Sequence, residues 1–273
     1  MEEEEWVALT SSTGMAGHVD HQQAILNGLY ENIERDSFTI TWMQQLDVPK
    51  IKITPEIQQY LDEQFPGSYE FHFLDVNLDL DVPAVFGICF GESDFGKFVA
   101  VGSACRTTYA EALLKVCTEI GQAVSYFRYL LGEVGDWVPS DDFHDLMNFE
   151  EHSIFYLKRP DLWHVFEPWR QKKATREIDF SERFTGSVVA EIRRITRRLH
   201  ERDCTVLVKE LTTPDIRQAG FCSLRVIVPE LIEMAGSYSF YFSGGKRLYD
   251  VPPALGYPRK TFDELNPYPH PFP

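Results

Sequence analysis

Three ionisable residues close together in the first part of the chain could bind a metal ion and a phosphate group. Glu31, Glu34 and Arg35 are three and four residues apart, which places two carboxylates and a guanidinium on one side of a helix. Carboxylate oxygens are preferred ligands of Mg²⁺, and a guanidinium binds phosphate through several N–H donors. The same spacing is typical of a solvated ion-pair face. Spacing alone therefore leaves both interpretations open.

The helix that must position these residues is predicted from Asp20 to about Gln45. Asp20 is a suitable N-cap, and no proline interrupts the segment. Gly28 inside this helix costs roughly 1 kcal/mol relative to Ala, which the close approach of another backbone or of a ligand would explain. One face of the helix should pack in the core, because apolar residues recur at helical spacing. These residues are Ala24, Ile25, Leu29 and Ile33.

A second predicted helix, from about Thr108 to Leu131, carries three further polar residues on one face, Glu111, Glu119 and Gln122. The five cysteines are odd in number and widely spaced, without a C-x-x-C pair, so we expect reduced, mostly buried thiols and no zinc site. Cys105, just before this helix, is expected to be a small packing residue.

Strands are predicted wherever short runs are rich in Val, Ile and Phe. The run from Ala84 to Phe90 is almost continuously apolar and should be buried on both faces of a sheet. The expected strands are 6–9, 69–76, 82–90, 97–101, 205–208 and 223–228, the last two also buried.

The remaining segments carry no assigned chemistry. A short helix should begin at Thr54-Pro55 and end at Pro66, and a basic amphipathic helix at 186–203 should present a solvated face, with docking to an acidic partner as the alternative. Residues 134–182 are expected to form short helices and loops. The histidines in them are predicted to be surface or core residues rather than metal ligands. These are His144, His152 and His164.

Composition limits the classes of function. The chain has 273 residues, 44% of them hydrophobic, which is enough for a sizeable core. A formal net charge of −16 argues against nucleic acid or an anionic membrane as partner. Glu2 to Glu5 are the opposite of a signal-peptide start, and no apolar run approaches about 18 residues. We therefore expect a cytoplasmic protein.

Three blocks, spread in order over the chain, resemble one protein family. The first begins at Gly14-x-Ala16-x-His18 and ends with Glu31-x-x-Glu34-Arg35-Asp36. The second comprises Gly102 to Arg106 and Glu119-x-x-Gln122, and the third is the alternating-proline ending, Pro267 to Pro273. The first two blocks are similar to motifs of the YcaO proteins, ATP-dependent enzymes that activate peptide-backbone amides. The third is similar to the C-terminus of azoline-forming YcaO cyclodehydratases.

The resemblance implies ATP and Mg²⁺ as cofactors and a role for each matched residue. Glu31 and Glu34, with Gln23, would hold Mg²⁺. Four residues would form the nucleotide site, namely Arg35, Arg106, Glu119 and Gln122. The tail residues Pro269, Pro271 and Pro273 would act in cyclodehydration, with the carboxylate of Pro273 as a base. The alternative for this tail is disorder.

The resemblance also implies the fold class and the organisation of the chain. We expect a mixed α/β fold in which a mixed sheet packs against long amphipathic helices. Residues 1–256 would be a partial YcaO catalytic domain whose N-terminal half is missing, and 257–273 a proline-rich tail. Val19, where many members carry a metal-binding side chain, is a departure from the family pattern.

The implied function is cyclodehydration of Cys, Ser or Thr in a ribosomally synthesised precursor peptide, through phosphorylation of a backbone amide by ATP. The implied partners are this peptide, an E1-like or peptide-recognition protein, and a separate N-terminal YcaO half. One alternative is a non-catalytic or split remnant that binds a partner or a peptide. Another is a thioamide-forming YcaO enzyme, against which the proline tail argues.

Overall fold

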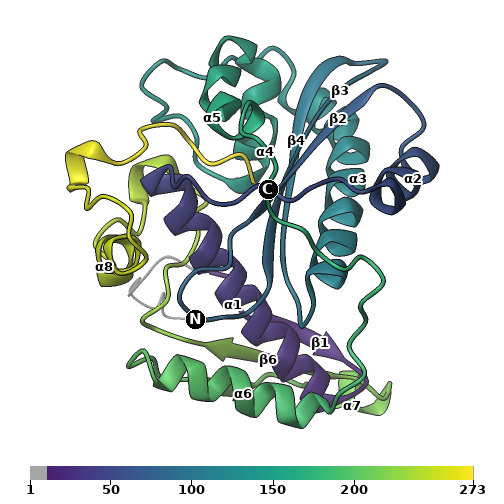
Figure 1. Cartoon of the computed structure of the whole chain (residues 1–273), viewed down its shortest axis with the longest axis vertical. Coiled ribbons are helices and arrows are strands. Elements are labelled where there is room, and N and C mark those ends of the chain that lie inside the picture. Colours follow the sequence, from purple (N-terminus) through teal and green to yellow (C-terminus); the bar gives the residue numbers. More distant parts are fainter. Residues whose placement is uncertain (1–10, 273) are drawn as a thin grey trace, which may run out of the picture.

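The computed structural model describes residues 11–272, so the strand expected at 6–9 lies outside the described residues. A long central helix, α1 (His21–Gln44), organises the fold, and both sheets contact it (Figure 1). Asp20 caps α1 as expected, because its carboxylate accepts a hydrogen bond from the Gln23 backbone N–H at 2.8 Å. The predicted bounds of this helix are confirmed.

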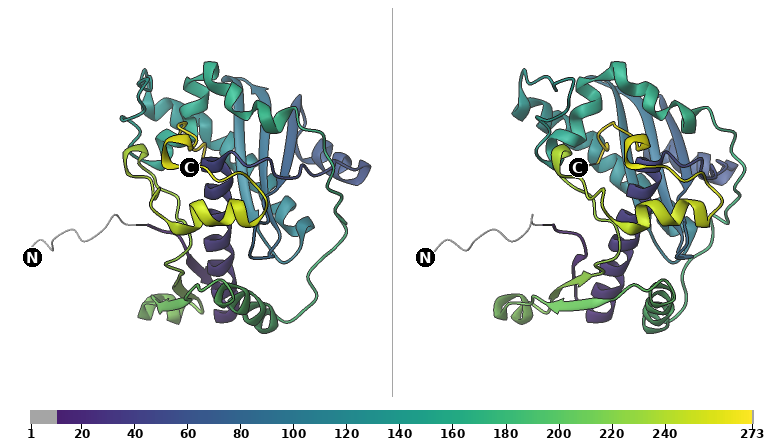
Figure 2. Two further views of the ribbon diagram at one scale, coloured as in Figure 1. Left: turned by 60° about the vertical axis from the view of Figure 1, so that its left-hand side comes forward. Right: turned by 90° about the vertical axis from the view of Figure 1, so that its left-hand side faces the viewer.

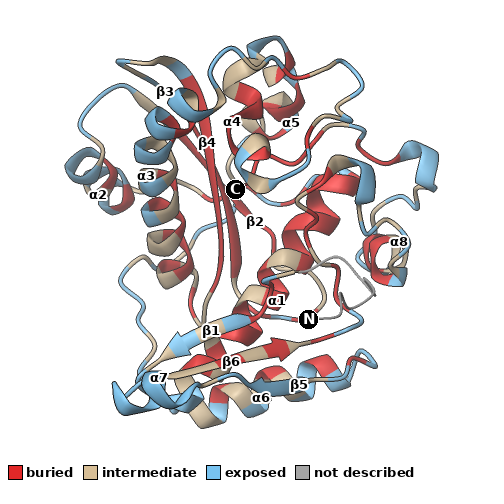
Figure 3. Cartoon of the chain, turned by 180° about the vertical axis from the view of Figure 1, so that it is seen from behind, coloured by how far each residue is buried: buried red, intermediate tan, exposed pale blue. Residues whose placement is uncertain are grey.

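The larger sheet has the order β2–β3–β4 and is antiparallel throughout, with strands Tyr69–Asp75, Ala84–Ser93 and Gly96–Cys105. Its two faces are covered by α1 and by α3 (Tyr109–Val134) (Figure 1). Alternate residues of β3 therefore enter two cores: Phe86 and Ile88 join the core that contains α1, and Val85 joins the one that contains α3. This confirms the prediction that β3 is buried on both faces (Figure 3).

The smaller sheet lies beside the N-terminal part of α1, away from the larger sheet (Figure 2). It has the order β1–β6–β5, with strands Met15–His18, Cys222–Ile227 and Leu207–Glu210. The expected strand at 223–228 is confirmed as β6. The expectation of a buried strand at 205–208 is wrong, because β5 is an edge strand whose four residues are all exposed (Figure 3). An edge strand has a hydrogen-bonded neighbour on one side only.

The α/β class is confirmed, although the named strands form two antiparallel sheets where a mixed sheet was expected. The expected helix after Thr54 is confirmed as α2 (Pro55–Gln64), and 134–182 do form short helices and loops. None of the described helices is both long and apolar enough to cross a membrane. The other elements are α4 (Phe149–Lys158), η1 (Pro160–Phe166), α5 (Glu167–Arg170), α6 (Val188–His200), α7 (Pro214–Gln218), η2 (Tyr238–Phe240), α8 (Lys246–Ala254) and η3 (Phe262–Glu264).

The basic face of α6 is partly neutralised within the chain. Arg194 forms an ion pair with Glu191 at 2.7 Å, and Arg198 pairs with Asp81 at 3.0 Å. Arg193 and Arg197 remain exposed. The default expectation of a solvated face therefore holds for only part of this helix.

Gly28 lies where α1 passes close to β6. A Cβ atom at this position would lie 2.7 Å from Cγ2 of Val226 and 2.9 Å from the carbonyl oxygen of Gly14. Of the two expected explanations, the approach of another part of the chain is therefore the one that the structure shows. It brings α1 against β6.

We predict that Gly28→Ala lowers the free energy of unfolding by about 1–3 kcal/mol, because overpacking outweighs the higher helix propensity of Ala. Gly132→Ala is the matched control, since a Cβ at Gly132 in α3 meets nothing within 4 Å. This control should gain about 0.5–1 kcal/mol. Urea unfolding of both variants measures the difference. Equal stabilisation by the two substitutions would contradict the close approach.

The proline-rich tail packs against the protein. Leu265, Asn266 and residues 269–272 are buried, and Phe272 is only 4% exposed. The alternative of a disordered tail is therefore wrong for the part that the structure describes. The division of the chain at residue 256 stays a prediction.

Candidate functional site

Carboxylates from two helices come together beside strand β4. Glu31 and Glu34 lie on α1 and Glu119 lies on α3, and the charge of Glu119 raises the pKa of both α1 carboxyls. Arg35 and Arg106 lie close enough to lower the pKa of Glu34. The structure thus brings together five of the residues selected from the sequence, and it places three acids against two cations.

Glu34 is buried, with 8% of its surface exposed. Burial raises its pKa to about 8, and the charge of Glu119 contributes in the same direction. Its nearest cation, Nε of Arg35, lies 3.9 Å from the Glu34 carboxylate, and no hydrogen bond reaches that carboxylate from residues 11–272. The interpretation of Glu34 as part of an exposed, solvated ion-pair face is therefore wrong, because packing around α1 covers this side of the helix.

Glu31 lies one turn earlier and accepts a hydrogen bond from the Gly14 N–H at 3.2 Å. Burial raises its pKa, whereas Arg35 and this hydrogen bond oppose the shift. Gln23 is two further turns toward the N-terminus of α1, and its side chain donates to Asn27 at 3.1 Å. Val19, at 66% exposure, points to solvent.

Glu119 is held against strand β4 by the motif that precedes α3. Its carboxylate accepts a hydrogen bond from the Ser103 N–H at 3.2 Å and pairs with Lys115 at 3.2 Å. Gly102 makes this approach possible, because a Cβ there would lie 2.8 Å from the carbonyl oxygen of Val116. The Gly102-Ser103 pair in the sequence thus has a physical explanation.

Arg106 has a different environment from Arg35. Its guanidinium donates to the carbonyl oxygen of Cys105 at 2.6 Å and lies 5.7 Å from the centre of the Tyr30 ring. Cys105 is fully buried, and burial raises the pKa of its thiol, as expected for a packing residue. Arg106 therefore approaches, from the end of β4, the acidic cluster that consists of Glu31, Glu34 and Glu119.

A pocket of about 840 Å³ opens beside these charges. Arg35, Glu119 and Gln122 line it, whereas Gln23, Glu31, Glu34 and Arg106 do not. Of the predicted nucleotide residues, three thus share one pocket, and the fourth is adjacent through Glu34. The complete lining consists of Arg35, Val101, Thr118, Glu119, Gly121, Gln122, Ala123, Ser125, Tyr126, Ser153 and Phe272.

The tail reaches the same pocket. Pro269 and Pro271 are buried, and the guanidinium of Arg35 lies 5.9 Å from the centre of the Phe272 ring. Phe272 is one wall of the pocket. Pro273, the third proline of the predicted set, lies outside the described residues, and its role stays a prediction.

The donor set fits Mg²⁺ by its chemistry. Among residues 11–272, no group of three or more His, Cys, Asp or Glu side chains converges to hold a metal. Mg²⁺ usually keeps several waters and takes one or two carboxylates together with substrate phosphates, so a complete protein cage is not required. Glu34, buried and without a hydrogen bond from the described residues, is the group that a cation would stabilise.

Sequence reasoning missed several residues at this site. Lys115 is one turn before Glu119 on α3, and the i, i+4 spacing could have revealed it. The hydroxyl of Ser103 is buried without a hydrogen-bond partner in the described chain. Tyr126 lies one turn after Gln122 on α3, so the i, i+4 spacing could also have revealed it, whereas Phe272, a member of the tail block, reaches the pocket through tertiary packing.

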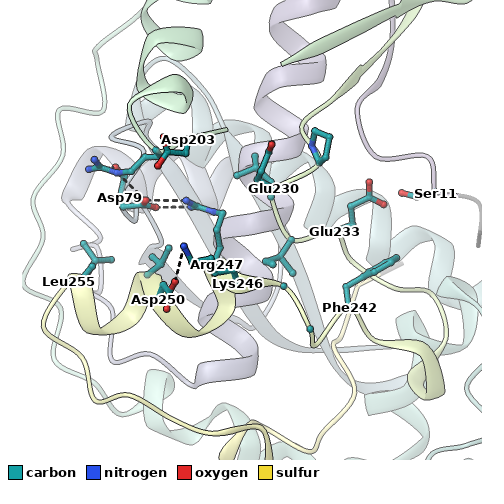
Figure 4. A pocket seen from close by; sticks show the side chains of 18 of the residues that line it. Ser11, Asp79, Asp203, Glu230, Glu233, Phe242, Lys246, Arg247, Asp250 and Leu255 are labelled. Carbon is teal, nitrogen blue, oxygen red and sulfur yellow. Dashed lines mark hydrogen bonds and ion pairs between the residues drawn. The ribbon is translucent and has the colours of Figure 1, made fainter. Parts of the chain in front are cut away.

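A larger pocket, of about 1560 Å³, lies elsewhere, between α8 and the segments that contain residues 202–203 and 229–233 (Figure 4). None of the predicted site residues lines it. Some of its charged residues pair with one another: Arg247 contacts Asp79 at 2.7 Å, and Lys246 contacts Asp250 at 3.7 Å. The residues selected from the sequence therefore lie at the smaller pocket, and size does not identify the candidate site.

Two solved structures share the fold over nearly the whole chain. A heterocyclase in complex with substrate and cofactor is similar with a TM-score of 0.72 and 24% identity, over 97% of this chain and 34% of its own. The heterocyclase TruD is similar with a TM-score of 0.69 and 22% identity, over 97% and 35%. The chain thus spans about a third of the length of these proteins.

The structure of YcaO from Methanopyrus kandleri bound with AMPPCP and Mg²⁺ is also similar, with a TM-score of 0.59 and 19% identity, over 84% of this chain and 58% of its own. No curated protein matches the chain in sequence. The sequence model described as YcaO cyclodehydratase, ATP- and Mg²⁺-binding, matches residues 1–232. Because this match covers most of the 273 residues, the chain belongs to the YcaO family.

Proposed function

We propose that this chain is a component of an azoline-forming YcaO cyclodehydratase, which uses ATP to activate backbone amides of a precursor peptide. One observation carries the proposal. Acidic and basic residues from α1 and α3 meet beside a pocket that the proline-rich tail also reaches. A site with hard oxygen donors, guanidinium groups and an ordered tail suits phosphoryl transfer to a bound peptide.

In this proposal, each residue has a defined task. Arg35 binds the phosphates of the nucleotide from inside the pocket, and Arg106 supports it from the end of β4. Glu119 and Gln122 shape the nucleotide side of the pocket. Glu31 and Glu34, with Gln23 further along the same helix, hold Mg²⁺. Pro269 and Pro271 fix the tail beside the reacting centre.

The chemistry begins when a Cys thiol or a Ser or Thr hydroxyl forms a bond to the carbonyl carbon of the preceding amide. The amide oxygen receives the proton of the attacking group and becomes a hemiorthoamide hydroxyl; this hydroxyl then gives its proton to a base while its oxygen takes the γ-phosphoryl group of ATP and ADP leaves. Phosphate then departs, a C=N bond forms, and the nitrogen loses its proton to give the azoline. Mg²⁺ held by Glu31 and Glu34 would supply neutralisation of charge on the phosphoryl oxygens. Arg35 provides cationic stabilisation from the protein at the same oxygens.

We propose that the complete activity needs additional polypeptide. The chain covers 34% and 35% of the two heterocyclases, so most of those proteins has no counterpart in it. The structure of the E. coli microcin synthetase McbBCD with pro-MccB17 bound, which shares the fold with a TM-score of 0.53, is a multi-protein complex. By analogy, the partners here are the precursor peptide, an E1-like or peptide-recognition protein, and a polypeptide with the rest of a YcaO domain.

A second candidate is a partner-binding remnant without catalysis. Val19 is exposed and cannot bind a metal, and the neutral side chain of Gln23 is already hydrogen-bonded to Asn27. These two features would weaken a metal site at this end of α1. The packed proline tail favours the azoline-forming branch over thioamide formation.

Calorimetric titration with Mg²⁺-ATP tests the proposal, first with the chain alone and then with the companion polypeptides present. We expect binding when the companions are present, followed by azoline formation on the precursor peptide. Binding by the chain alone would indicate a site that is more complete than proposed. Absence of binding in both experiments would favour the remnant.

Two matched arginine variants locate the binding site. Arg35→Ala should weaken nucleotide binding by about tenfold to a hundredfold, because a hydrogen bond to a charged group contributes about 1.5–3 kcal/mol. Arg193→Ala removes the same charge from the exposed face of α6 and should change nothing. Equal effects of both variants would mean that net charge alone controls nucleotide affinity.

A further inference from the structure

The proline-rich tail is fixed by a series of side-chain hydrogen bonds. Prolines have no N–H, so an extended proline-rich segment forms no internal ladder, and its carbonyl oxygens need donors from elsewhere. Four consecutive carbonyls find such donors. Those of Pro267, Tyr268, Pro269 and His270 accept from Tyr238 Oη at 2.7 Å, Trp42 Nε1 at 3.0 Å, Tyr156 Oη at 2.7 Å and His152 Nδ1 at 2.9 Å.

The last of these contacts belongs to a buried pair of histidines. The rings of His152 and His270 stack with their centres 4.0 Å apart and their planes inclined by 10°. His152 is 0% exposed and His270 is 2% exposed. A stack this close is favourable for two neutral rings and unfavourable for two charged ones.

The hydrogen bonds define how each ring is protonated. A carbonyl oxygen can only accept, so Nδ1 of His152 carries the proton that it donates to His270, and its Nε2 is an unprotonated base. This Nε2 is buried and has no hydrogen-bond partner among residues 11–272. On His270, Nε2–H donates to the Ala235 carbonyl at 2.8 Å, and Nδ1 accepts from the Phe272 N–H at 3.3 Å.

A second proton on either ring would disturb this arrangement. On His270 it would turn the acceptor of the Phe272 N–H into a donor. Burial lowers the pKa of His152 to about 4 and lowers the pKa of His270 well below its ordinary value, and the charges of His152 and Arg35 add to the effect on His270. Another ionisable group that faces the pair is the phenol of Tyr241, whose ring packs edge-on against both histidines and whose oxygen accepts from the backbone N–H of His270 at 3.2 Å.

We propose that His152 and His270 are positioning residues, which as a neutral stacked pair hold the tail so that Phe272 forms one wall of the pocket beside Arg35. Within residues 11–272 no hydrogen bond or ion pair joins the pair to a predicted nucleotide residue, and the pair acts through Phe272. Ser153, the neighbour of His152 on α4, lines the same pocket, which places the pair directly behind it. The predicted effect of the pair on activity rests on the proposed function. The docking of the tail does not, because it can be measured without catalytic turnover.

Hydrogen exchange of the C-terminal peptide in the full chain tests tail docking. In the segment 267–272 only Tyr268, His270 and Phe272 have an exchangeable backbone amide, since the other residues are proline. Each histidine that gains a proton on release should lower the protection factor of these amides by about tenfold per pH unit between pH 6 and pH 4. The stability of docking is lost as pH falls, because the released histidines bind more protons than the docked ones.

Two substitutions separate positioning from general destabilisation. His152→Ala removes the donor and the stack, and should lower the protection factors of the tail amides at least tenfold at pH 7. His152→Asn keeps an N–H donor at the Nδ1 position without a titrating ring. This variant should keep the protection factors of the tail amides at pH 7. Toward pH 4 these factors should fall by about tenfold per pH unit, whereas in the unaltered chain, with two titrating histidines, the fall should approach a hundredfold per unit.

The activity measurement adds a readout that a purely structural role would not change. In a chain lacking 267–273, His152→Ala should cause no further loss of ATP hydrolysis with the companions present, because its effect passes through the tail. Tail release by His152→Ala without ATP hydrolysis in any variant would support the positioning pair and contradict the proposed function. If the unaltered chain and His152→Asn lose tail protection with the same pH dependence, the pair does not hold the tail. That comparison remains decisive even if His152→Ala fails to fold.

Discussion

Glu34→Gln is expected to abolish Mg²⁺-nucleotide-dependent turnover while raising the free energy of unfolding at pH 8. A buried carboxylate without a hydrogen bond from the described residues is costly to keep charged, and the amide has nearly the same shape without the charge. One pKa unit corresponds to about 1.4 kcal/mol, so the gain in stability should exceed about 1 kcal/mol. ATP hydrolysis with the companions present and urea unfolding at pH 8 measure the two effects.

The pH dependence has a defined sign. The folded-state pKa of Glu34, about 8, is above the ordinary value of 4.5, so the unfolded chain binds fewer protons than the folded one between these two values. The stability contributed by Glu34 is therefore complete below pH 4.5 and is lost as pH rises through 8. Glu34→Gln should remove this dependence. Glu133→Gln, at an exposed position of α3, is the matched control and should leave it unchanged.

Binding of Mg²⁺ should oppose the proton at the same carboxylate. Because the ligand must be deprotonated, affinity for Mg²⁺ in the presence of nucleotide should rise by up to about tenfold per pH unit below pH 8. If Glu34→Gln lost stability and retained ATP hydrolysis, Glu34 would instead be a structural residue.

Arg247→Ala is expected to lower the free energy of unfolding by about 3–5 kcal/mol, because it leaves a buried carboxylate without its partner. Asp36 is 0% exposed, and its carboxylate accepts from Arg247 at 2.7 Å and 3.0 Å and from the Ile232 N–H at 2.9 Å. The same guanidinium also binds Asp79 at 2.7 Å (Figure 4). The loss is a large fraction of the stability of a typical domain.

The neighbouring residue provides the control for this prediction. The side chain of Lys246 is 90% exposed and lies 3.7 Å from Asp250, so Lys246→Ala should change stability by less than about 1 kcal/mol. Thermal or urea unfolding of both variants measures the contrast. Similar midpoints for the two would show that the Asp36–Arg247 pair contributes little to the fold.

The two predictions assign different functions to two residues of one sequence motif. Glu34 and Asp36 are two positions apart in the block that resembles the YcaO family, which on a helix separates their side chains by about 200°. Glu34 faces the acidic cluster, whereas Asp36 faces Arg247 in the core. Sequence resemblance groups the two residues together. Helix geometry predicts opposite directions for them, but only the tertiary fold shows what lies in each direction.

Local sequence was sufficient for much of the architecture. The bounds of α1, its Asp20 cap and the two-sided burial of β3 follow from apolar period, capping preference and strand composition, which act over a few residues. The close approach at Gly28 was also predictable, since a glycine inside a helix carries a cost that packing must explain. The exposure of β5 was not predictable, because an apolar strand has the same sequence pattern whether or not another layer of the fold covers it.

The sequence by itself determined the family, the two helices that carry the candidate site, and the residue types available for binding Mg²⁺ and phosphate. Tertiary structure decided which carboxylate is buried, that the tail is packed with Phe272 against Arg35, and that His152 belongs to a stacked pair behind the pocket. The physical reason is the range of the forces involved. Backbone conformation is set mainly by neighbouring residues, whereas burial, and with it the protonation of Glu34 and His152, depends on residues distant in the sequence.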